Sequence, residues 1–435
     1  MNLKSSDLKK VLIVTYYWPP AGGPGVQRWL KFVKYLPDFG VEPIVYIPEN
    51  PTYPIVDEKL IDEVSKDVIL LKQEIKEPYR LAAFFSKKNT QKISSGIIPN
   101  KKKQGLIERM LLWVRGNLFI PDARVLWVKP SVAFLEKYCR ENAIDAIITT
   151  GPPHSLHLIG LALQKKSGIK WVADFRDPWT TIGYHNELLL SSKAAQKHKE
   201  LEREVLQKAD LIVVTSPTTQ KEFQALTQQP IEVITNGYDV EKVEKKPMDE
   251  KFTLAHIGSL LSERNPKMLW KVLQELCQEN PQFKSDFQLK FIGKVSQEVL
   301  DTLIEFQLEN HVNNLGYLSH LEAVSEQRKS QVLLLIEIDR LDTRCIIPGK
   351  LFEYMVSERP IIGIGPKGSD FASILTTTNT GIFFEYREEE RLKKVLLSYY
   401  QLYLEKNLKV YPVGLQQYSR KSLTEKLVQL LQEKL

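Results

Sequence analysis

The chain has 435 residues, of which 43% are hydrophobic and 26% are charged. These fractions are ordinary for a globular protein and exclude a disordered or fibrous chain. The length exceeds what one hydrophobic core usually supports, so we expect two domains of roughly 200 residues each. The net charge of +7 is a modest excess, and we expect no nucleic-acid partner.

Cysteine usage and the N-terminal sequence bear on the cellular compartment. Cys139, Cys277 and Cys345 are far apart in the sequence and make neither a metal cluster nor a plausible disulfide framework. The first residues are polar and run straight into an apolar strand, so no signal peptide is expected. No window approaches about 18 uninterrupted apolar residues, the length that would span a membrane. We therefore expect a cytoplasmic protein.

The first predicted domain opens with a strand, a glycine-rich loop, a helix and a second strand. The strands are expected at 11–17 and 41–47 and the helix at 26–36, with the loop WPPAGGPGVQR before it. This order is a βαβ unit. The loop departs from the dinucleotide fingerprint, because Arg28 stands where the third glycine would be and Trp-Pro-Pro lengthens the turn. By itself the loop indicates flexible glycines with positive φ angles.

A basic segment follows this unit. Between residues 72 and 129 there are thirteen Lys or Arg and four Asp or Glu, with three consecutive lysines at 101–103. An amphipathic helix is expected next, with Arg109 and Arg115 beside a face that carries Leu106, Met110, Trp113, Val114 and Leu118. Such a helix suits an anionic bilayer surface, which predicts peripheral contact of 101–119 with the inner face of the cell membrane. The alternative is a solvated basic loop followed by a core-facing helix.

Polar residues follow two predicted strands of this domain. The strand at 144–150 leads into Gly-Pro-Pro-His, and the strand at 170–173 leads into Asp-Phe-Arg-Asp-Pro-Trp. Ligands of open parallel sheets bind beyond the carboxyl ends of the strands, so His154, Arg176 and Asp177 are the candidate catalytic residues. The alternatives are a salt-bridged Arg–Asp loop, and a packed or capping role for His154 and for His157.

A charged linker at 241–251 separates this half from a second series of strands. These are expected at 252–257, 288–292, 315–318 and 332–338, and they lead to the segment 346–365, IIPGKLFEYMVSERPIIGIG. Its Pro348-Gly349 turn and Lys350 at a helix start suit a phosphate, and Glu353 less than one turn later suits the vicinal hydroxyls of a ribose. The alternative is a capped helix start with Lys350 and Glu353 as a surface pair.

A literal GxGxxG motif follows this segment, at Gly363, Gly365 and Gly368. It comes after a strand and before a helix, which by motif alone indicates NAD binding. Against this, Pro366 lies inside the loop, the following helix is short, and the strand is the fifth of its domain instead of the first. We therefore do not assign a dinucleotide cofactor to it.

The segment 346–365 resembles the donor-binding segment of glycosyltransferase family 4, with its Pro-Ser/Gly-Lys-x-x-Glu run before a Pro-Val/Ile-Ile strand. The hexapeptide 174–179 is similar to an Asp-Phe-Arg-Asp-Pro-Trp box of a subset of that family. The similarity covers nearly the whole chain. It implies the GT-B fold, an α/β architecture of two Rossmann-like parallel-sheet domains that face each other across a cleft. The implied parts are an acceptor-side domain at 1–245, a nucleotide-sugar-binding domain at 250–415, and a helix at 416–435 that crosses back to the first domain.

The resemblance also implies roles for residues of the first half. The backbone of Gly22 and Gly23 would approach the donor phosphates and the transferred sugar, and Asn236 would belong to a turn near the domain junction. Arg176 holds the place of a histidine that faces the donor sugar in relatives. Because arginine cannot act as a base near neutral pH, we expect it to bind sugar hydroxyls or phosphate.

In the second half the chain departs from the family pattern at two positions. Relatives carry two cations after the first strand of this domain, and here Ser259 replaces one and Arg264 the other. The resemblance therefore implies that Arg264 and Lys350 hold the donor diphosphate. Glu353 matches the second of two motif glutamates, whereas Cys345 stands in the place of the first, which leaves the sugar specificity open.

These observations predict a hexosyltransferase that uses a UDP or GDP sugar and a glycan or lipid-linked acceptor, in cell-surface polysaccharide biosynthesis. The resemblance implies retention at the anomeric carbon, and Arg264, Lys350 and backbone amides would replace a metal at the diphosphate. No cofactor is expected. Two alternatives stay open, a nucleotide-sugar epimerase of the same fold and a non-catalytic subunit that binds a nucleotide sugar.

Overall fold

The computed structural model describes residues 9–77, 106–183, 185, 188–239 and 247–435. Internal contacts divide the chain into two units, the first Met1–Thr235 with Arg420–Leu435 and the second Asn236–Ser419. Residues 236–239 group with the second unit, where the Tyr238 backbone N–H donates to the Tyr418 carbonyl at 3.1 Å. The predicted lysine run 101–103 and most of the predicted linker lie outside the described residues.

The first unit is built on a seven-stranded sheet in the order β3-β2-β1-β4-β5-β6-β7, with all paired strands parallel. The strands are β1 (Lys10–Val14), β2 (Glu42–Pro48), β3 (Ile69–Gln73), β4 (Ala146–Gly151), β5 (Lys170–Phe175), β6 (Leu211–Val214) and β7 (Ile231–Val233). Gly151 of β4 pairs with Phe175 of β5, so both strands end at the same level. The loops that carry His154 and Arg176 therefore leave the sheet side by side.

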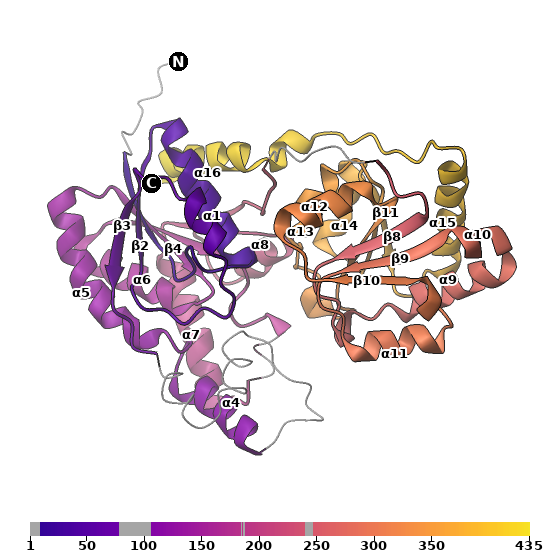
Figure 1. The fold of residues 1–435 in the computed structure, drawn as a ribbon. Helices are drawn as coiled ribbons and strands as arrows, with labels where there is room; N and C mark the ends of the chain where they lie inside the picture. The colour runs from indigo at the N-terminus through magenta and orange to yellow at the C-terminus, as the bar shows by residue number, and fades with distance from the viewer. Residues whose placement is uncertain (1–8, 78–105, 184, 186–187, 240–246) are drawn as a thin grey trace. The chain divides into compact units, whose positions relative to one another are not determined.

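Helices cover both faces of this sheet, because alternate residues of each buried parallel strand enter opposite cores. Leu12 and Val14 lie in one core, and Val11 and Ile13 lie in the other. The helices are α1 (Pro24–Tyr35), α4 (Leu106–Leu118), α5 (Val125–Asn142), α6 (Ser155–Ser167), α7 (Ser192–Lys208), α8 (Pro217–Gln224) and α16 (Arg420–Lys434), with 3-10 turns η1 (Leu36–Phe39) and η2 (Glu58–Glu63). The last helix, α16, packs against the first, α1 (Figure 1).

The second unit has a six-stranded sheet in the order β10-β9-β8-β11-β12-β13, again with all paired strands parallel. The strands are β8 (Phe252–Ile257), β9 (Phe287–Ile292), β10 (Val312–Gly316), β11 (Val332–Ile336), β12 (Ile361–Gly365) and β13 (Gly381–Glu385). Leu254 and Leu334 enter one core, and Ala255 and Leu333 enter the other. Strand β8 is central, and its carboxyl end leads to Arg264.

The helical elements of the second unit follow the same alternation of strand and helix. They are η5 (Ser262–Arg264), α9 (Lys267–Glu279), α10 (Pro281–Asp286), α11 (Gln297–Glu305), η6 (Glu309–His311), α12 (His320–Lys329), η7 (Leu341–Thr343), α13 (Lys350–Met355), α14 (Asp370–Thr377), α15 (Glu389–Leu404) and η8 (Leu415–Tyr418). The fold class predicted from the sequence, two Rossmann-like parallel-sheet domains, is confirmed. No helix among the described residues is long and apolar enough to span a bilayer.

Candidate functional site

The amine of Lys350 in the second unit contacts strand β8, which is distant in sequence. Neither of its hydrogen bonds goes to a neighbour in the sequence. Its Nζ donates to the Ile257 carbonyl at 3.0 Å and lies 3.3 Å from Nε2 of His256, both on β8. Among the described residues no carboxylate lies within ion-pair distance of this amine, so the surface pair with Glu353 considered above does not form. Burial and the like charge of Arg264 together lower the pKa of Lys350 to about 7, and the carboxylate of Glu337 opposes this shift.

Arg264 is the second cation at this edge of the sheet. Its Nη2 and Nε donate to Oε1 of Glu337, the residue directly after β11, at 2.9 and 3.2 Å. The Glu337 side chain is 2% exposed, whereas that of Arg264 is 27% exposed. The same Oε1 accepts from the Ile338 backbone N–H at 2.9 Å, so the carboxylate is fixed from two sides. Arg264 is therefore positioned by a buried acid while part of its guanidinium still reaches solvent.

Ser259 and Gly349 lie close to these cations. Gly258, directly before the exposed Ser259, has φ +108°, and a Cβ built on it would lie 3.5 Å from the Lys350 Nζ. Gly349 caps α13 with an ordinary helical φ of −57°, and a Cβ there would meet no atom within 4 Å. Neither strain nor packing demands a glycine at 349. The open space beside it is what the approach of a ligand to the backbone would need.

The remaining predicted residues of this unit lie around the same loop. The Pro348 carbonyl accepts from the Leu351 N–H at 2.9 Å and starts the turn into α13. Glu353, partly buried in the first turn, accepts at its backbone carbonyl from Gln327 at 2.8 Å. Cys345 is buried. Asn236 is partly buried at the beginning of the second unit.

In the first unit Arg176 is clamped by two loops. Its Nη1 donates to the Gly25 carbonyl at 2.8 Å, and its Nη2 donates to the Pro152 carbonyl. A Cβ on Gly25 would lie 2.6 Å from Nη1, so a larger residue at this position would displace the Arg176 guanidinium. The Arg176 guanidinium also lies 5.7 Å from the Tyr17 ring centre. The structure thus brings together the loops after β1, β4 and β5 around one arginine.

Asp177, the residue after Arg176, places a carboxyl group in the loop that follows β5. It is partly buried, and no side-chain hydrogen bond to it is found among the described residues. Burial raises its pKa above the ordinary aspartate value, and the charge of Arg176 opposes that rise. A partly buried carboxylate with a raised pKa is a candidate proton acceptor.

His154 and His157 are packed into the unit below these loops. The His154 ring stacks on Trp179 at 5.1 Å, and neither of its nitrogens finds a partner among the described residues. His157 accepts from or donates to Thr149 Oγ1 at 2.9 Å. Burial lowers the pKa of both, that of His157 to about 3, and neighbouring positive charges contribute. Both imidazoles are therefore neutral at physiological pH.

Gly22 and Gly23 have local reasons to be glycine. Gly23 has φ +89°, and a Cβ on Gly22 would lie 2.9 Å from the Ile55 side chain. The Gly22 N–H is already used, because it donates to the Ile55 carbonyl at 2.9 Å. Their approach to a donor stays a prediction.

Sequence reasoning missed the buried polar residues that fix these loops. Asp174 accepts from Arg28 Nη2, Trp29 Nε1 and Thr150 Oγ1, each at 2.8 Å. Burial alone would raise the pKa of Asp174, but Arg28 and the other donors bring it below the ordinary value. The signal was available, since Asp174 opens the hexapeptide box and Arg28 interrupts the glycine loop, although nothing local pairs them.

Helix α4 presents its apolar face to solvent. Met110, Trp113 and Leu118 are 59%, 45% and 64% exposed, whereas Leu112 on the other side is buried. Asn117 anchors the helix by donating to the Leu189 carbonyl and accepting from the Ser191 N–H, at 2.8 and 2.7 Å. In the described part of the predicted amphipathic helix, this apolar face therefore points away from the core.

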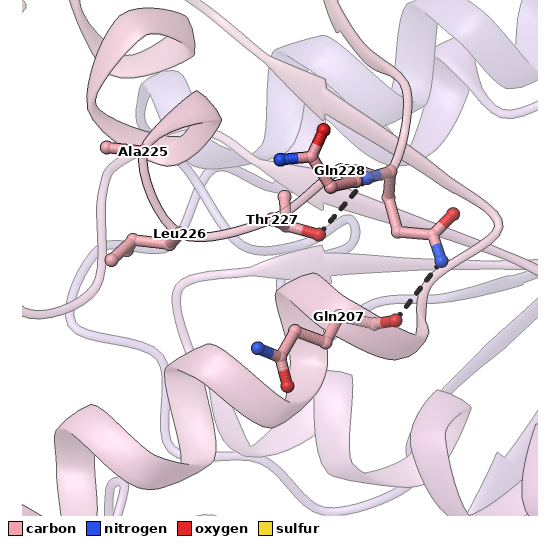
Figure 2. A pocket seen from close by; sticks show the side chains of 6 residues that line it. Gln207, Ala225, Leu226, Thr227 and Gln228 are labelled. Carbon is pink, nitrogen blue, oxygen red and sulfur yellow. Dashed lines mark hydrogen bonds between the residues drawn. The ribbon is translucent and has the colours of Figure 1, made fainter.

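A surface pocket of the first unit lies away from these residues. Figure 2 shows it between the end of α7 and the loop after α8, lined by Gln207, Ala225, Leu226, Thr227, Gln228 and Gln229. Those segments lead into the amino ends of β6 and β7, opposite to the edge that carries Arg176. The Thr227 hydroxyl donates to the Leu206 carbonyl at 2.8 Å, so its polar lining serves the loop itself. Among the described residues no group of three or more His, Cys, Asp or Glu could hold a metal ion.

Comparison with known proteins agrees with this architecture. The family model described as Glycosyltransferase Family 4 matches residues 97–242, about a third of the chain. The structure of HepE from Anabaena in complex with UDP superposes with a TM-score of 0.61 at 12% identity, over 97% of this chain and 99% of that one. Sucrose-phosphate synthase from Thermosynechococcus elongatus gives 0.60 at 12% identity, over 97% and 98%.

WaaG, a glycosyltransferase involved in lipopolysaccharide biosynthesis, gives a TM-score of 0.56 at 12% identity, over 97% of this chain and 100% of that one. At these identities the likeness shows the fold, which is that of the GT-B glycosyltransferases. The family match supports a relationship to family 4, whereas the subset with the hexapeptide box stays a prediction. No curated protein matches the chain by sequence.

Proposed function

We propose that the protein is a glycosyltransferase that moves a hexose from a nucleotide diphosphate sugar to a glycan or lipid-linked acceptor. The observation that carries the proposal is the pair of cations at the carboxyl edge of the second sheet, Lys350 and Arg264, beside the open backbone of Gly349. Two fixed positive groups stabilise the negative charge that develops on a leaving diphosphate. The family match and the GT-B fold support the same class.

The proposed donor carries UDP or GDP, and UDP is the first to test. Structures of the similar HepE are complexes with UDP and with UDP-glucose. In this proposal Lys350 and Arg264 bind the diphosphate, and Glu353 binds the ribose. Ser259 and Pro348 belong to the loops that carry the two cations. No metal and no cofactor is required. Full activity after EDTA treatment supports that part, and restoration of lost activity by Mg²⁺ or Mn²⁺ contradicts it.

The proposed catalytic groups of the first unit act on the sugar and the acceptor. Arg176 cannot take up a proton, so it binds sugar hydroxyls or phosphate oxygens. Asp177 is the proposed proton acceptor for the attacking hydroxyl, since burial raises its pKa above the ordinary aspartate value. His154 is the proposed acceptor contact. NMR of the product reports the anomeric configuration, for which retention is proposed.

The proposed acceptor is reached at an anionic membrane surface through helix α4. Its exposed Met110, Trp113 and Leu118 form an apolar face, with Arg109 and Arg115 on either side of it. Such a face inserts shallowly while the basic residues bind anionic headgroups. Co-sedimentation with anionic vesicles that weakens with salt and in Trp113→Ser supports this. Equal pelleting with neutral and anionic vesicles contradicts it.

The decisive experiment is incubation of the purified full chain with UDP-glucose, UDP-galactose and GDP-mannose, with and without a panel of glycan and lipid-linked acceptors. A product one hexose heavier by mass spectrometry supports the proposal. Conversion of the donor sugar without acceptor, seen by NMR, favours a nucleotide-sugar epimerase. Selective nucleotide binding in thermal shift without transfer to any acceptor favours a binding subunit.

A further inference from the structure

His256 is a buried imidazole whose protonation pattern is fixed by its neighbours. It lies on the central strand β8, and its Nδ1 is 3.1 Å from the backbone carbonyl of Leu334 on β11. A carbonyl oxygen can only accept, so the contact with Leu334 favours the tautomer that carries its hydrogen on Nδ1 and offers a lone pair on Nε2. Burial holds the pKa of His256 well below its ordinary value, and the charges of Lys350 and Arg264 contribute. Hydrogen bonds to the backbone of Leu334 and Ser259 oppose this shift without reversing it, so the ring is neutral.

The lone pair of His256 meets the amine of Lys350. The distance from Nε2 to Nζ is 3.3 Å, and the Ile257 carbonyl is a second acceptor at 3.0 Å. Two neighbouring residues of one strand thus use two of the three N–H groups that a lysine ammonium has. The third N–H group remains for another acceptor.

The charges around Lys350 leave its ammonium without a bound counter-ion among the described residues. From η5 Arg264 contributes a like charge, and the carboxylate of Glu337 after β11 bonds to Arg264 instead of to Lys350. From α13 the Tyr354 hydroxyl accepts from the Ile257 N–H at 2.9 Å and is neutral. An anion that binds between Lys350 and Arg264 would supply the missing negative charge.

We propose that His256 is a positioning residue that holds the Lys350 amine against β8, and that Lys350 takes up one proton from solvent when the diphosphate of a nucleotide binds. This inference rests on the proposed function. The proton leaves again when the nucleoside diphosphate dissociates, so nucleotide affinity falls as the pH rises above neutral. The pKa of Lys350 near 7 agrees with such an exchange at physiological pH.

Isothermal titration of the full chain with UDP, in buffers of different ionisation enthalpy, measures the proton uptake directly. With a pKa of about 7 for Lys350, we expect uptake of roughly half a proton per UDP at pH 7, rising toward one at pH 8. Lys350→Arg is the matched control, because arginine stays charged and should bind UDP without uptake. Binding of UDP to the wild type with no more uptake than in Lys350→Arg overturns the inference and leaves the proposed function intact.

His256→Gln and His256→Leu test the positioning role. Glutamine can still accept from Lys350, so UDP affinity should stay within about threefold, whereas leucine cannot and should lose about tenfold. Equal affinity of wild type and His256→Leu overturns the inference. If His256→Leu does not fold, labelling of the wild type with an amine-acylating reagent decides, since half-maximal modification of Lys350 near pH 7 supports the inference and near pH 10 overturns it. Failure of both UDP and GDP to bind or to protect Lys350 overturns the inference and the proposed function together.

Discussion

Arg28 and Asp174 form a buried ion pair 2.8 Å long in which each side chain is 1% exposed. Arg28 stands in the first turns of α1, and Asp174 lies in β5, so the pair joins the glycine loop to the strand that carries Arg176. The Arg28 Nη1 also donates to the Thr235 carbonyl at 2.9 Å. Every polar atom that this pair brings into the core is thereby matched, which is the condition for a buried charge to be tolerated.

Asp174→Ala should therefore destabilise the first unit strongly. Removal of one partner leaves the Arg28 guanidinium buried and unpaired, with an expected loss of about 3–5 kcal/mol of unfolding free energy. Urea unfolding followed by circular dichroism measures this. Glu141→Ala is the control, because its pair with Lys137 is exposed and should contribute less than ~1 kcal/mol. Equal unfolding midpoints for the two variants would show that the buried pair is not a stabilising feature.

Lys350→Ala and Arg264→Ala should each reduce hexose transfer by about 10²–10³-fold, because each removes a fixed positive group from the developing diphosphate charge. Initial rates, measured with the nucleotide sugar that supports transfer in the experiment proposed above, test this. Arg264→Lys separates the charge from the contact with Glu337, since it keeps the cation but not the two-point bond. Lys267→Ala, an exposed lysine of the adjacent helix, should be unaffected. Near-normal rates in both alanine variants would remove these residues from the mechanism.

Stability should fall as the pH drops below about 6.5. Burial lowers the folded-state pKa of His185 to about 4 and that of His157 to about 3, and it also lowers those of His154, His198 and His256. Below the ordinary histidine pKa the unfolded chain then binds more protons than the folded one, so acid favours unfolding.

Each such histidine contributes up to about 1.4 kcal/mol per pH unit between its folded and unfolded pKa values. Urea midpoints at pH 7.5, 6.5 and 5.5 should therefore decrease with increasing steepness. His198→Gln should flatten the curve, because it removes one of these groups. A midpoint that does not change down to pH 5.5 would mean that the rings are accessible to protons in the folded protein.

Gly349→Ala and Gly23→Ala should behave in opposite ways. Position 349 has a helical φ and open space for a Cβ, so alanine should leave stability unchanged or raise it by about 0.4–1 kcal/mol. Position 23 has φ +89°, where alanine is strained and should lower stability by about 1 kcal/mol or more. Despite its stability, Gly349→Ala should weaken UDP binding in titration calorimetry. Unchanged affinity would show that no ligand approaches that backbone.

The sequence predicted the parallel sheets because their central strands are continuous apolar runs. A strand needs such a run when both of its faces are buried by helices. Strand β3 was not predicted. It lies at the edge of the sheet and is only partly buried, so its sequence, Ile-Leu-Leu-Lys-Gln, lacks the long apolar run of a central strand. Helix α5 was also missed, because Pro130 lies inside it and a proline usually interrupts a helix. Strand β10 begins three residues before the predicted strand, at Val312 instead of Leu315.

For the candidate site, the sequence predicted Lys350 and Arg264 as its cations but not the groups that hold them. His256 and Leu334 are 78 residues apart, and Arg264 and Glu337 are 73 apart. Such contacts depend on the register of β8 against β11, which no local pattern encodes. The local alternative, a pair between Lys350 and Glu353 three residues on, was visible in the sequence and is not formed.

The packing of α16 on α1 has a consequence for biosynthesis. Leu423, Leu427 and Leu431 close the same core as Val26 and Trp29, so the first unit to be translated is the last to be completed. The second unit is contiguous in sequence and can fold as it leaves the ribosome. Until α16 is synthesised, the apolar core residues of the first unit that this helix covers stay exposed. A fragment that stops after residue 235 should consequently need a chaperone, or a separately supplied peptide of residues 420–435, to stay in solution.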